Sequence, residues 1–185
     1  AGHRRKHACE LAGLTAMPVI VRDMDRDSAT IVMVDSNLQR ESILPSERAK
    51  AYKMKLDAIK RRAGRPSKDE QENAPNVSAN FRSDDEVGQE AGVSGDTIRN
   101  YIALTQLVPE LQKMVDDKKI ALTPAYQLAA LTPKEQALLL ETIDSEQATP
   151  SLSQAQRMKK LSQSGELNED TMLQIMAEQK KPERT

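Results

Sequence analysis

The chain has 185 residues, of which 38% are hydrophobic and 30% are charged, a composition typical of one helix-rich domain or two small ones. Its single cysteine, Cys9, excludes an internal disulfide framework and is typical of a reducing compartment. Only four residues are aromatic, which argues against the stacking platforms that bind single-stranded nucleic acid. Since neither a signal-peptide pattern nor a long apolar run is present, nothing in the sequence suggests export or a membrane span, and we expect a cytoplasmic protein without membrane contacts.

The formal net charge of −1 hides an uneven distribution along the chain. Residues 1–65 carry 14 Lys and Arg against 8 Asp and Glu, whereas residues 66–185 carry 13 against 20. The basic first third suits an anionic ligand, either the phosphate backbone of DNA or a nucleotide, because its charges attract such a ligand and release counterions.

The beginning of the chain predicts a helix followed by a short strand. Residues 2–13 place Ala8 and Leu11 on one side of a helix, and Gly13 closes it. The apolar run at residues 17–21 predicts a short buried strand. Together they give the first third of the chain an expected α/β character.

Residues 25–40 fit two kinds of element. The β-branched and apolar residues at positions 30–34 favour a strand. Ile31, Val34 and Leu38 instead fall at helical spacing, behind polar residues suited to an N-cap. We predict the helix.

A clear helix and then a linker follow. Residues 46–62 place Tyr52, Leu56 and Ile59 on one helical face, after a proline suited to the first turn. Residues 63–82 have no periodicity and are rich in Gly, Pro, Asn, Ser and charge, which predicts a linker.

Residues 83–104 have the pattern of a helix-turn-helix. Ser83 is suited to cap a first helix, and the acidic residues at positions 84–86 favour its electropositive N-terminus. Gly88 leaves room where a second helix would cross, and Gly92 can adopt the left-handed conformation that ends a helix.

The second helix of this pattern has an inward and an outward face. Ser94 can cap it, and Ile98 and Tyr101 belong to the inward side. In a helix-turn-helix the exposed half of this helix enters the major groove, where Arg99 suits guanine and Asn100 suits adenine. The predicted DNA contacts are Ser94, Gly95, Asp96, Thr97, Arg99 and Asn100.

The same pattern also fits an ordinary pair of packed helices with a glycine turn. Residues 83–123 are net acidic, so DNA affinity there needs a few placed contacts, dimerisation or basic residues from elsewhere in the fold. Helix-start signals then continue to the end of the chain, without a predicted strand. The further predicted helices are residues 109–115, 124–131 and 133–143, and two segments within 151–180 separated by Gly165.

Two short segments and the helix-turn-helix carry a family resemblance. Residues 2–8, GHRRKHA, resemble the box G-E-R-R-x-R-A, and residues 36–40, SNLQR, resemble the box E-N-x-Q-R. With the helix-turn-helix following in the same order, the chain resembles the ParB-type partition proteins, which bind centromere-like DNA in plasmid and chromosome segregation.

The resemblance implies a nucleotide site in the first third of the chain. It implies that Gly2, Arg4 and Arg5 contact the phosphates of CTP and that Asn37 lies beside the phosphates and Mg²⁺. Paired guanidinium groups suit a polyanion of this kind. His3 and Ser36 stand where the family boxes have glutamate, so we expect no CTP hydrolysis and no metal site in this chain.

The combined interpretation is a mainly α protein, α+β overall, that begins inside a family box and is therefore expected to be a fragment. Its predicted parts are residues 1–62 as a truncated α/β nucleotide-binding-like module, 63–82 as a linker, 83–145 as an all-helical helix-turn-helix domain and 146–185 as C-terminal helices.

The predicted function is sequence-specific binding of double-stranded DNA in partition or nucleoid organisation. A homodimer and a ParA-type ATPase are the further partners that the resemblance implies, with CTP and Mg²⁺ as cofactors of the full-length protein only. A transcriptional repressor shares the same DNA chemistry and is one alternative. A protein-interaction scaffold without DNA binding is the other.

Overall fold

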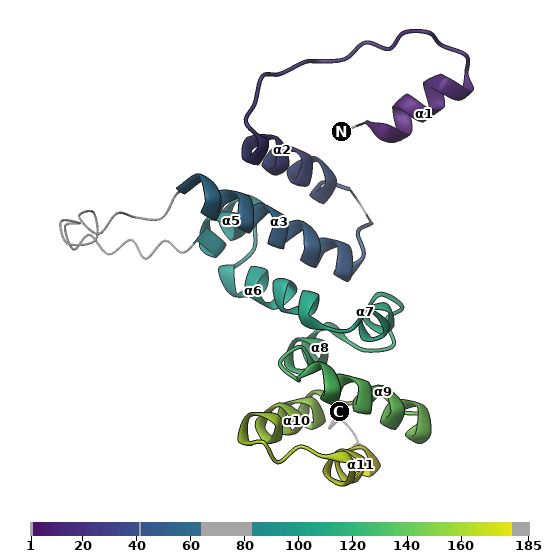
Figure 1. Cartoon of the computed structure of the whole chain (residues 1–185), viewed down its shortest axis with the longest axis vertical. Coiled ribbons are helices and arrows are strands. Elements are labelled where there is room, and N and C mark those ends of the chain that lie inside the picture. The colour runs from purple at the N-terminus through teal and green to yellow at the C-terminus, as the bar shows by residue number, and fades with distance from the viewer. Residues whose placement is uncertain (1, 41, 64–82, 179–185) are drawn as a thin grey trace, which may run out of the picture.

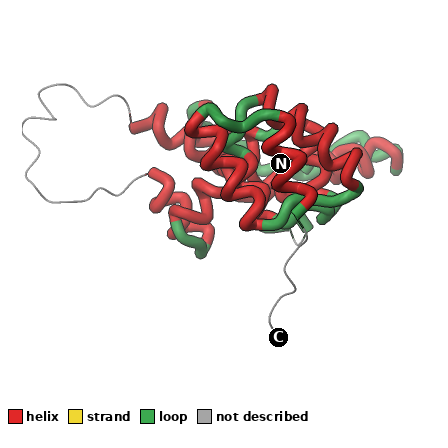
Figure 2. Tube along the Cα trace, turned by 90° about the horizontal axis from the view of Figure 1, so that it is seen from below, coloured by secondary structure: helices red, strands yellow, loops and turns green. Residues whose placement is uncertain are grey.

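The computed structural model describes residues 2–40, 42–63 and 83–178, and regular structure in these ranges is helical (Figure 1). Figure 2 shows helices and loops and no strand in the same ranges, which confirms the mainly α prediction. The elements are α1 (His3–Leu11), α2 (Arg26–Leu38), α3 (Pro45–Ala63), α5 (Ser83–Ala91), α6 (Gly95–Ala103), the 3-10 turn η1 (Leu104–Gln106), α7 (Pro109–Asp116), α8 (Leu122–Leu128), α9 (Pro133–Glu146), α10 (Leu152–Ser164) and α11 (Glu169–Ala177).

The helix predicted within residues 25–40 is confirmed by α2. Its N-cap is Asp25, whose Oδ1 accepts hydrogen bonds from the backbone N–H groups of Asp27 and Ser28, both at 2.9 Å. Val34 is buried on the inner side of this helix. Capping and a buried apolar face therefore outweigh the β propensity of the segment.

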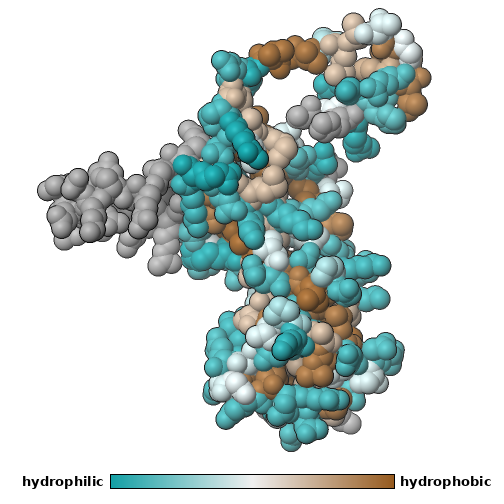
Figure 3. Space-filling model, in the orientation of Figure 1, coloured by the Kyte–Doolittle hydropathy of each residue, from teal (hydrophilic) through white to brown (hydrophobic). Residues whose placement is uncertain are grey.

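The predicted strand at residues 17–21 is wrong. These residues form neither helix nor strand, and Val19, Ile20 and Val21 are 64%, 85% and 87% exposed. Figure 3 shows the segment as a brown, apolar run between α1 and α2. A strand requires a second strand for its backbone hydrogen bonds, and none lies in the described part of the chain. The expected α/β character of the first module is therefore absent from the described residues.

Helix α1 lies apart from the other helices, and a long stretch without helix or strand connects it to α2 (Figure 1). The predicted linker, residues 63–82, lies outside the described residues except for its first residue, which ends α3. None of the helices in the described ranges has the length and apolar character needed to cross a bilayer.

Helix α3 is the centre of the packing, since it contacts α2, α5, α6, η1 and α7. Tyr52 and Leu56 of α3 are buried together with Val87 of α5 and Ile98 of α6. The ring of Tyr52 meets that of Tyr101 edge-on, with 5.7 Å between centroids. The helix that the sequence places in the first module thus shares a core with the helix-turn-helix.

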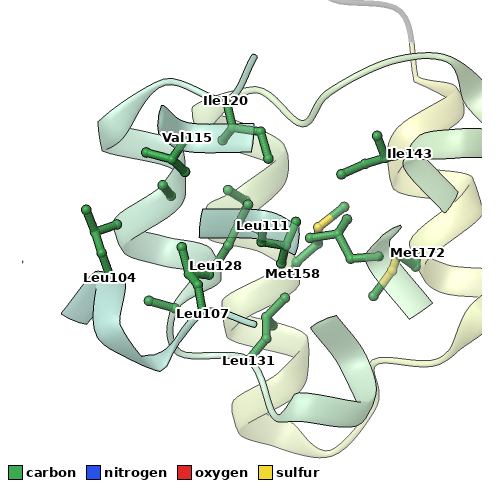
Figure 4. Close-up of a cluster of buried hydrophobic side chains, with 14 of the residues drawn as sticks. Leu104, Leu107, Leu111, Val115, Ile120, Leu128, Leu131, Ile143, Met158 and Met172 are labelled. Carbon is green, nitrogen blue, oxygen red and sulfur yellow. The ribbon is translucent and has the colours of Figure 1, made fainter. Parts of the chain in front are cut away.

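A larger core lies among η1 and α7 to α11 (Figure 4). Helix α8 packs on α10 and α9 packs on α11. The start of α9 agrees with the predicted one, and capping boxes at Thr132, Ser151 and Asn168 begin α9, α10 and α11. The fully buried side chains include Leu111, Leu128, Leu139, Met158, Met172 and Ile175.

A buried glutamine connects α9 to the turn that precedes α7. The Oε1 atom of Gln136 accepts a hydrogen bond from the backbone N–H of Val108 at 2.7 Å. Its Nε2 atom donates to the carbonyl oxygens of Leu131 at 2.9 Å and Gln106 at 3.2 Å. These bonds satisfy backbone groups that the core would otherwise leave unpaired.

Candidate nucleic-acid interface

Helices α5 and α6 cross through the glycine turn that the sequence predicts. Gly92 has φ = 69°, and the N–H of Val93 donates to the carbonyl oxygen of Gly88 at 2.9 Å. A Cβ atom on Gly88 would lie 2.7 Å from the carbonyl oxygen of Val93 and 3.0 Å from the backbone nitrogen of Gly95. The two helices therefore approach closely only because position 88 has no side chain.

The start of α6 is capped as predicted. The Oγ atom of Ser94 accepts a hydrogen bond from the N–H of Thr97 at 3.1 Å and lies 2.9 Å from the Thr97 hydroxyl. Ile98 is fully buried on the inner face of the helix, and Tyr101 and Ile102 pack beside it.

Five of the six predicted DNA contacts are accessible. Ser94, Asp96 and Asn100 are exposed, and Thr97 and Arg99 are partly exposed. Gly95 differs from the prediction, because it is buried rather than outward-facing. Its place on the helix surface is covered by the carboxylate of Asp85, with which a Cβ atom on Gly95 would collide.

Arg99 is held by carboxylates on both helices. Its Nη1 donates to Asp84 of α5 and its Nη2 donates to Asp96 of α6, while the nearest oxygen of Asp85 lies 4.0 Å from Nη1. The hydrogen bonds to Asp96 and Asp84 raise the pKa of Arg99 further above its ordinary range. We call Arg99 with Asp84, Asp85 and Asp96 the Arg99 cluster.

Two other cations near the helix-turn-helix have internal partners. The guanidinium of Arg48 lies over the ring of Tyr101, 5.6 Å from its centroid. Lys55 is 3% exposed, and its Nζ atom lies 2.6 Å from Asp35 of α2 and 2.5 Å from Glu90 of α5. Lys55 is therefore not presented to a phosphate backbone, whereas Arg48 is partly exposed.

The environment of Lys55 favours its charged form. Burial by itself lowers the pKa of this amine, but hydrogen bonds to Asp35 and Glu90 outweigh that effect and raise the pKa. Asp35, Lys55 and Glu90 line a cavity of about 490 Å³ between α2, α3 and α5. The two ion pairs of Lys55 thus fix α5, the first helix of the helix-turn-helix, against α2 and α3.

The predicted nucleotide-binding residues lie on two separate helices. Gly2 precedes α1 with φ = 97°, and Arg4 and Arg5 are exposed on α1. Asn37 lies on α2 and lines a cavity of about 330 Å³ between α2 and α3, without any residue of α1 in its lining. Within the described ranges, no hydrogen bond or ion pair joins Arg4 or Arg5 to Asn37, so nucleotide binding stays a prediction.

The sequence contains signals for the two charged sets that the prediction missed. Asp96 and Arg99 are three residues apart, the spacing of an ion pair on one helix face. Lys55 lies three residues after Tyr52 and four before Ile59, within the apolar face of a predicted helix. A cation at such a position implies a buried anionic partner, although not which one.

Comparison with known proteins gives one family model and several relatives. Residues 76–160 match the model described as ParB HTH domain. The chain is 32% identical over 132 residues to the probable chromosome-partitioning protein ParB of Treponema pallidum, which covers 71% of this chain and 34% of that protein. It is 33% identical over 136 residues to the probable chromosome 1-partitioning protein ParB of Deinococcus radiodurans, covering 73% and 38%.

A nucleoid occlusion protein of Listeria innocua is 30% identical over 145 residues, covering 78% of this chain and 44% of that protein. The chain thus spans less than half the length of these curated relatives. Among solved structures, the C-terminally truncated chromosome-partitioning protein ParB from Caulobacter crescentus, complexed to the centromeric parS site, matches with a TM-score of 0.52. The match covers 86% of this chain and 72% of that chain, and at 21% identity it shows a shared fold.

The close crossing at Gly88 generates the first prediction. Gly88→Ala is expected to lower the free energy of unfolding by about 1–3 kcal/mol, because backbone atoms of the turn must move to admit the methyl group. Urea denaturation followed by circular dichroism measures the loss. Gly92→Asn is the matched control, since asparagine tolerates a left-handed backbone and a Cβ atom there meets no neighbour within 4 Å. Equal losses in both variants would contradict the crossing.

The second prediction concerns the buried ammonium group. Lys55→Met is expected to lower the free energy of unfolding by about 1–3 kcal/mol at neutral pH, because two charge-assisted hydrogen bonds are lost. Since folding raises the pKa of Lys55, its stabilisation is complete below the ordinary lysine value of 10.5 and disappears as pH rises through the raised value.

The difference in urea midpoint between wild type and Lys55→Met should therefore narrow at high pH. Lys53→Met is the control, because Lys53 is exposed on the same helix. A constant difference across that pH range would show that packing of the side chain, and not its charge, stabilises the fold.

Proposed function

The chain belongs to the ParB-type partition family, and from this we propose that it binds double-stranded DNA sequence-specifically through α5 and α6. The observation that carries the proposal is the tight helix-turn-helix whose second helix presents its N-terminal half to solvent. In this motif the second helix lies in the major groove and the first crosses the backbone. The cellular role that follows is segregation or organisation of chromosomal or plasmid DNA.

Arg99 and Asn100 are the proposed base readers. Asn100 is exposed and suits a bidentate contact to adenine, and Arg99 suits guanine once it leaves part of its carboxylate cluster. Ser94 and Thr97, whose hydroxyls lie together at the start of α6, suit a phosphate next to the helix N-terminus.

The acidic character of α5 and α6 supports a dimer rather than a single binding module. A helix-turn-helix with few available cations gains little from the phosphate backbone, so two copies on a palindromic site would supply the missing contacts. We therefore include a homodimer in the proposal, and a ParA-type ATPase as the partner that couples it to segregation. Binding to chromosomal DNA would place the protein at the nucleoid.

The test is selection of duplexes from a random pool at two salt concentrations. Arg99→Ala/Asn100→Ala should lose the sequence preference, with each lost bidentate contact costing about 1–3 kcal/mol. Arg157→Ala is the charge-matched control, because Arg157 of α10 pairs with Glu178, the residue that follows α11. A double variant that retains the wild-type preference would reject the assignment of α6 to the groove.

A protein-interaction scaffold without DNA binding is the second candidate. The Arg99 cluster favours it, since the cation on the exposed half of α6 is surrounded by three carboxylates. Phosphate-dominated binding must weaken steeply as salt rises. In the selection experiment, DNA binding that is absent at low salt would favour the scaffold. A transcriptional repressor differs only in where its selected sites lie in the genome.

The finer proposal is that CTP controls DNA binding, as the family resemblance implies. It is supported by the exposed guanidinium groups of Arg4 and Arg5, and by a cavity beside Asn37 that Arg40 and Lys50 also line. Calorimetric titration of the full-length protein should show tighter binding of CTP than of ATP, and Arg4→Ala/Arg5→Ala should weaken the binding of CTP. Equal binding of both nucleotides, or none, rejects this finer proposal. The proposal does not include hydrolysis of CTP, because His3 and Ser36 replace the glutamates of the two family boxes.

A further inference from the structure

The two carboxylates that bind Arg99 differ in their exposure to solvent. Asp84, which binds Nη1, has a side chain that is 13% exposed, whereas the side chain of Asp96, which binds Nη2, is 82% exposed. Arg99 itself is 39% exposed. Asp84 therefore anchors the guanidinium against α5, while Asp96 holds its outward edge from the surface of α6.

The ion pair between Arg99 and Asp96, which we call the outer pair, is the one that a ligand can replace. An exposed ion pair between residues three apart on a helix contributes little to stability, since water competes for both partners. The anchor to Asp84 is mostly shielded from water and keeps the guanidinium in place. Opening the outer pair would present a donor edge of Arg99 and an acceptor carboxylate of Asp96 side by side on the exposed face of α6.

That combination is complementary to a base pair and not to a phosphate. Guanine offers the acceptors O6 and N7 to arginine, and the N4 amino group of cytosine donates to a carboxylate. A phosphate oxygen approaching Arg99 would meet the negative charges of Asp84, Asp85 and Asp96 as well as the guanidinium. Like charges brought together in this way penalise the wrong ligand.

We propose that Asp96 is a specificity-determining residue, which accepts a hydrogen bond from cytosine while Arg99 binds guanine, and which disfavours binding to phosphate alone. The proposal rests on the DNA-binding function proposed above. It extends the reader set from Arg99 and Asn100 to the acidic residue between the cap of α6 and these two readers. The acidic charge of the helix-turn-helix would then suppress binding to random DNA.

The experiment compares wild type with Asp96→Asn in duplex selection and in titrations of a random duplex. Asparagine prefers adenine, so the variant should replace cytosine by adenine at one position of the selected site. Its affinity for the random duplex at low salt should rise by roughly three- to tenfold, because one repelling charge is removed. Asp170→Asn on α11 is the control, since Asp170 is exposed and its substitution changes the net charge equally. Circular dichroism checks that each variant is folded.

The possible results distinguish failure of the proposed role of Asp96 from failure of the proposed DNA binding. A site with adenine in place of cytosine, together with tighter random binding, supports the role of Asp96. If Asp96→Asn selects the wild-type site and keeps the ratio of specific to random affinity, the inference is wrong and DNA binding stands. Failure of wild type and of both variants to bind any duplex at low salt would overturn the proposed function, and the inference with it.

Discussion

The buried ammonium group of Lys55 is the interaction on which the arrangement of the packed helices depends. It lies on α3, the helix that contacts five other elements, and it binds one carboxylate on α2 and one on α5. Removing an ammonium group from water costs several kcal/mol unless it is fully paired. Asp35 and Glu90 supply that pairing from two different helices, so charge as well as apolar packing contributes to the position of the helix-turn-helix.

The same principle governs the surface that we assign to DNA. Carboxylates hold the cations of this region in fixed places, Lys55 inside the fold and Arg99 at the edge of α6. On the proposed function, a surface built in this way would attract phosphate weakly and would depend on aligned contacts to bases, which favours specificity over affinity. Two copies acting on one site would restore the affinity that each surface lacks.

Local signals predicted the helices well and the strand badly, for one physical reason. A helix satisfies its backbone within the segment, so caps and apolar spacing suffice to locate it, as the predicted start of α9 at Thr132 illustrates. A strand satisfies its backbone through another strand, and residues 17–21 have none in the described part of the chain. Their apolar character therefore did not predict their conformation.

The sequence by itself determined the helix positions, the glycine turn between α5 and α6, and the motifs that suggested the family. These depend on interactions between residues only a few positions apart. The tertiary structure alone decided that Gly95 is buried, that Lys55 joins α2 to α5, and that Asp84 holds Arg99. Each of these depends on which helices pack together, because the paired side chains lie 15 or more residues apart or on different helices. Periodicity identifies the inward face of a helix. Only the packing of the helices decides which side chain of another helix lies against that face.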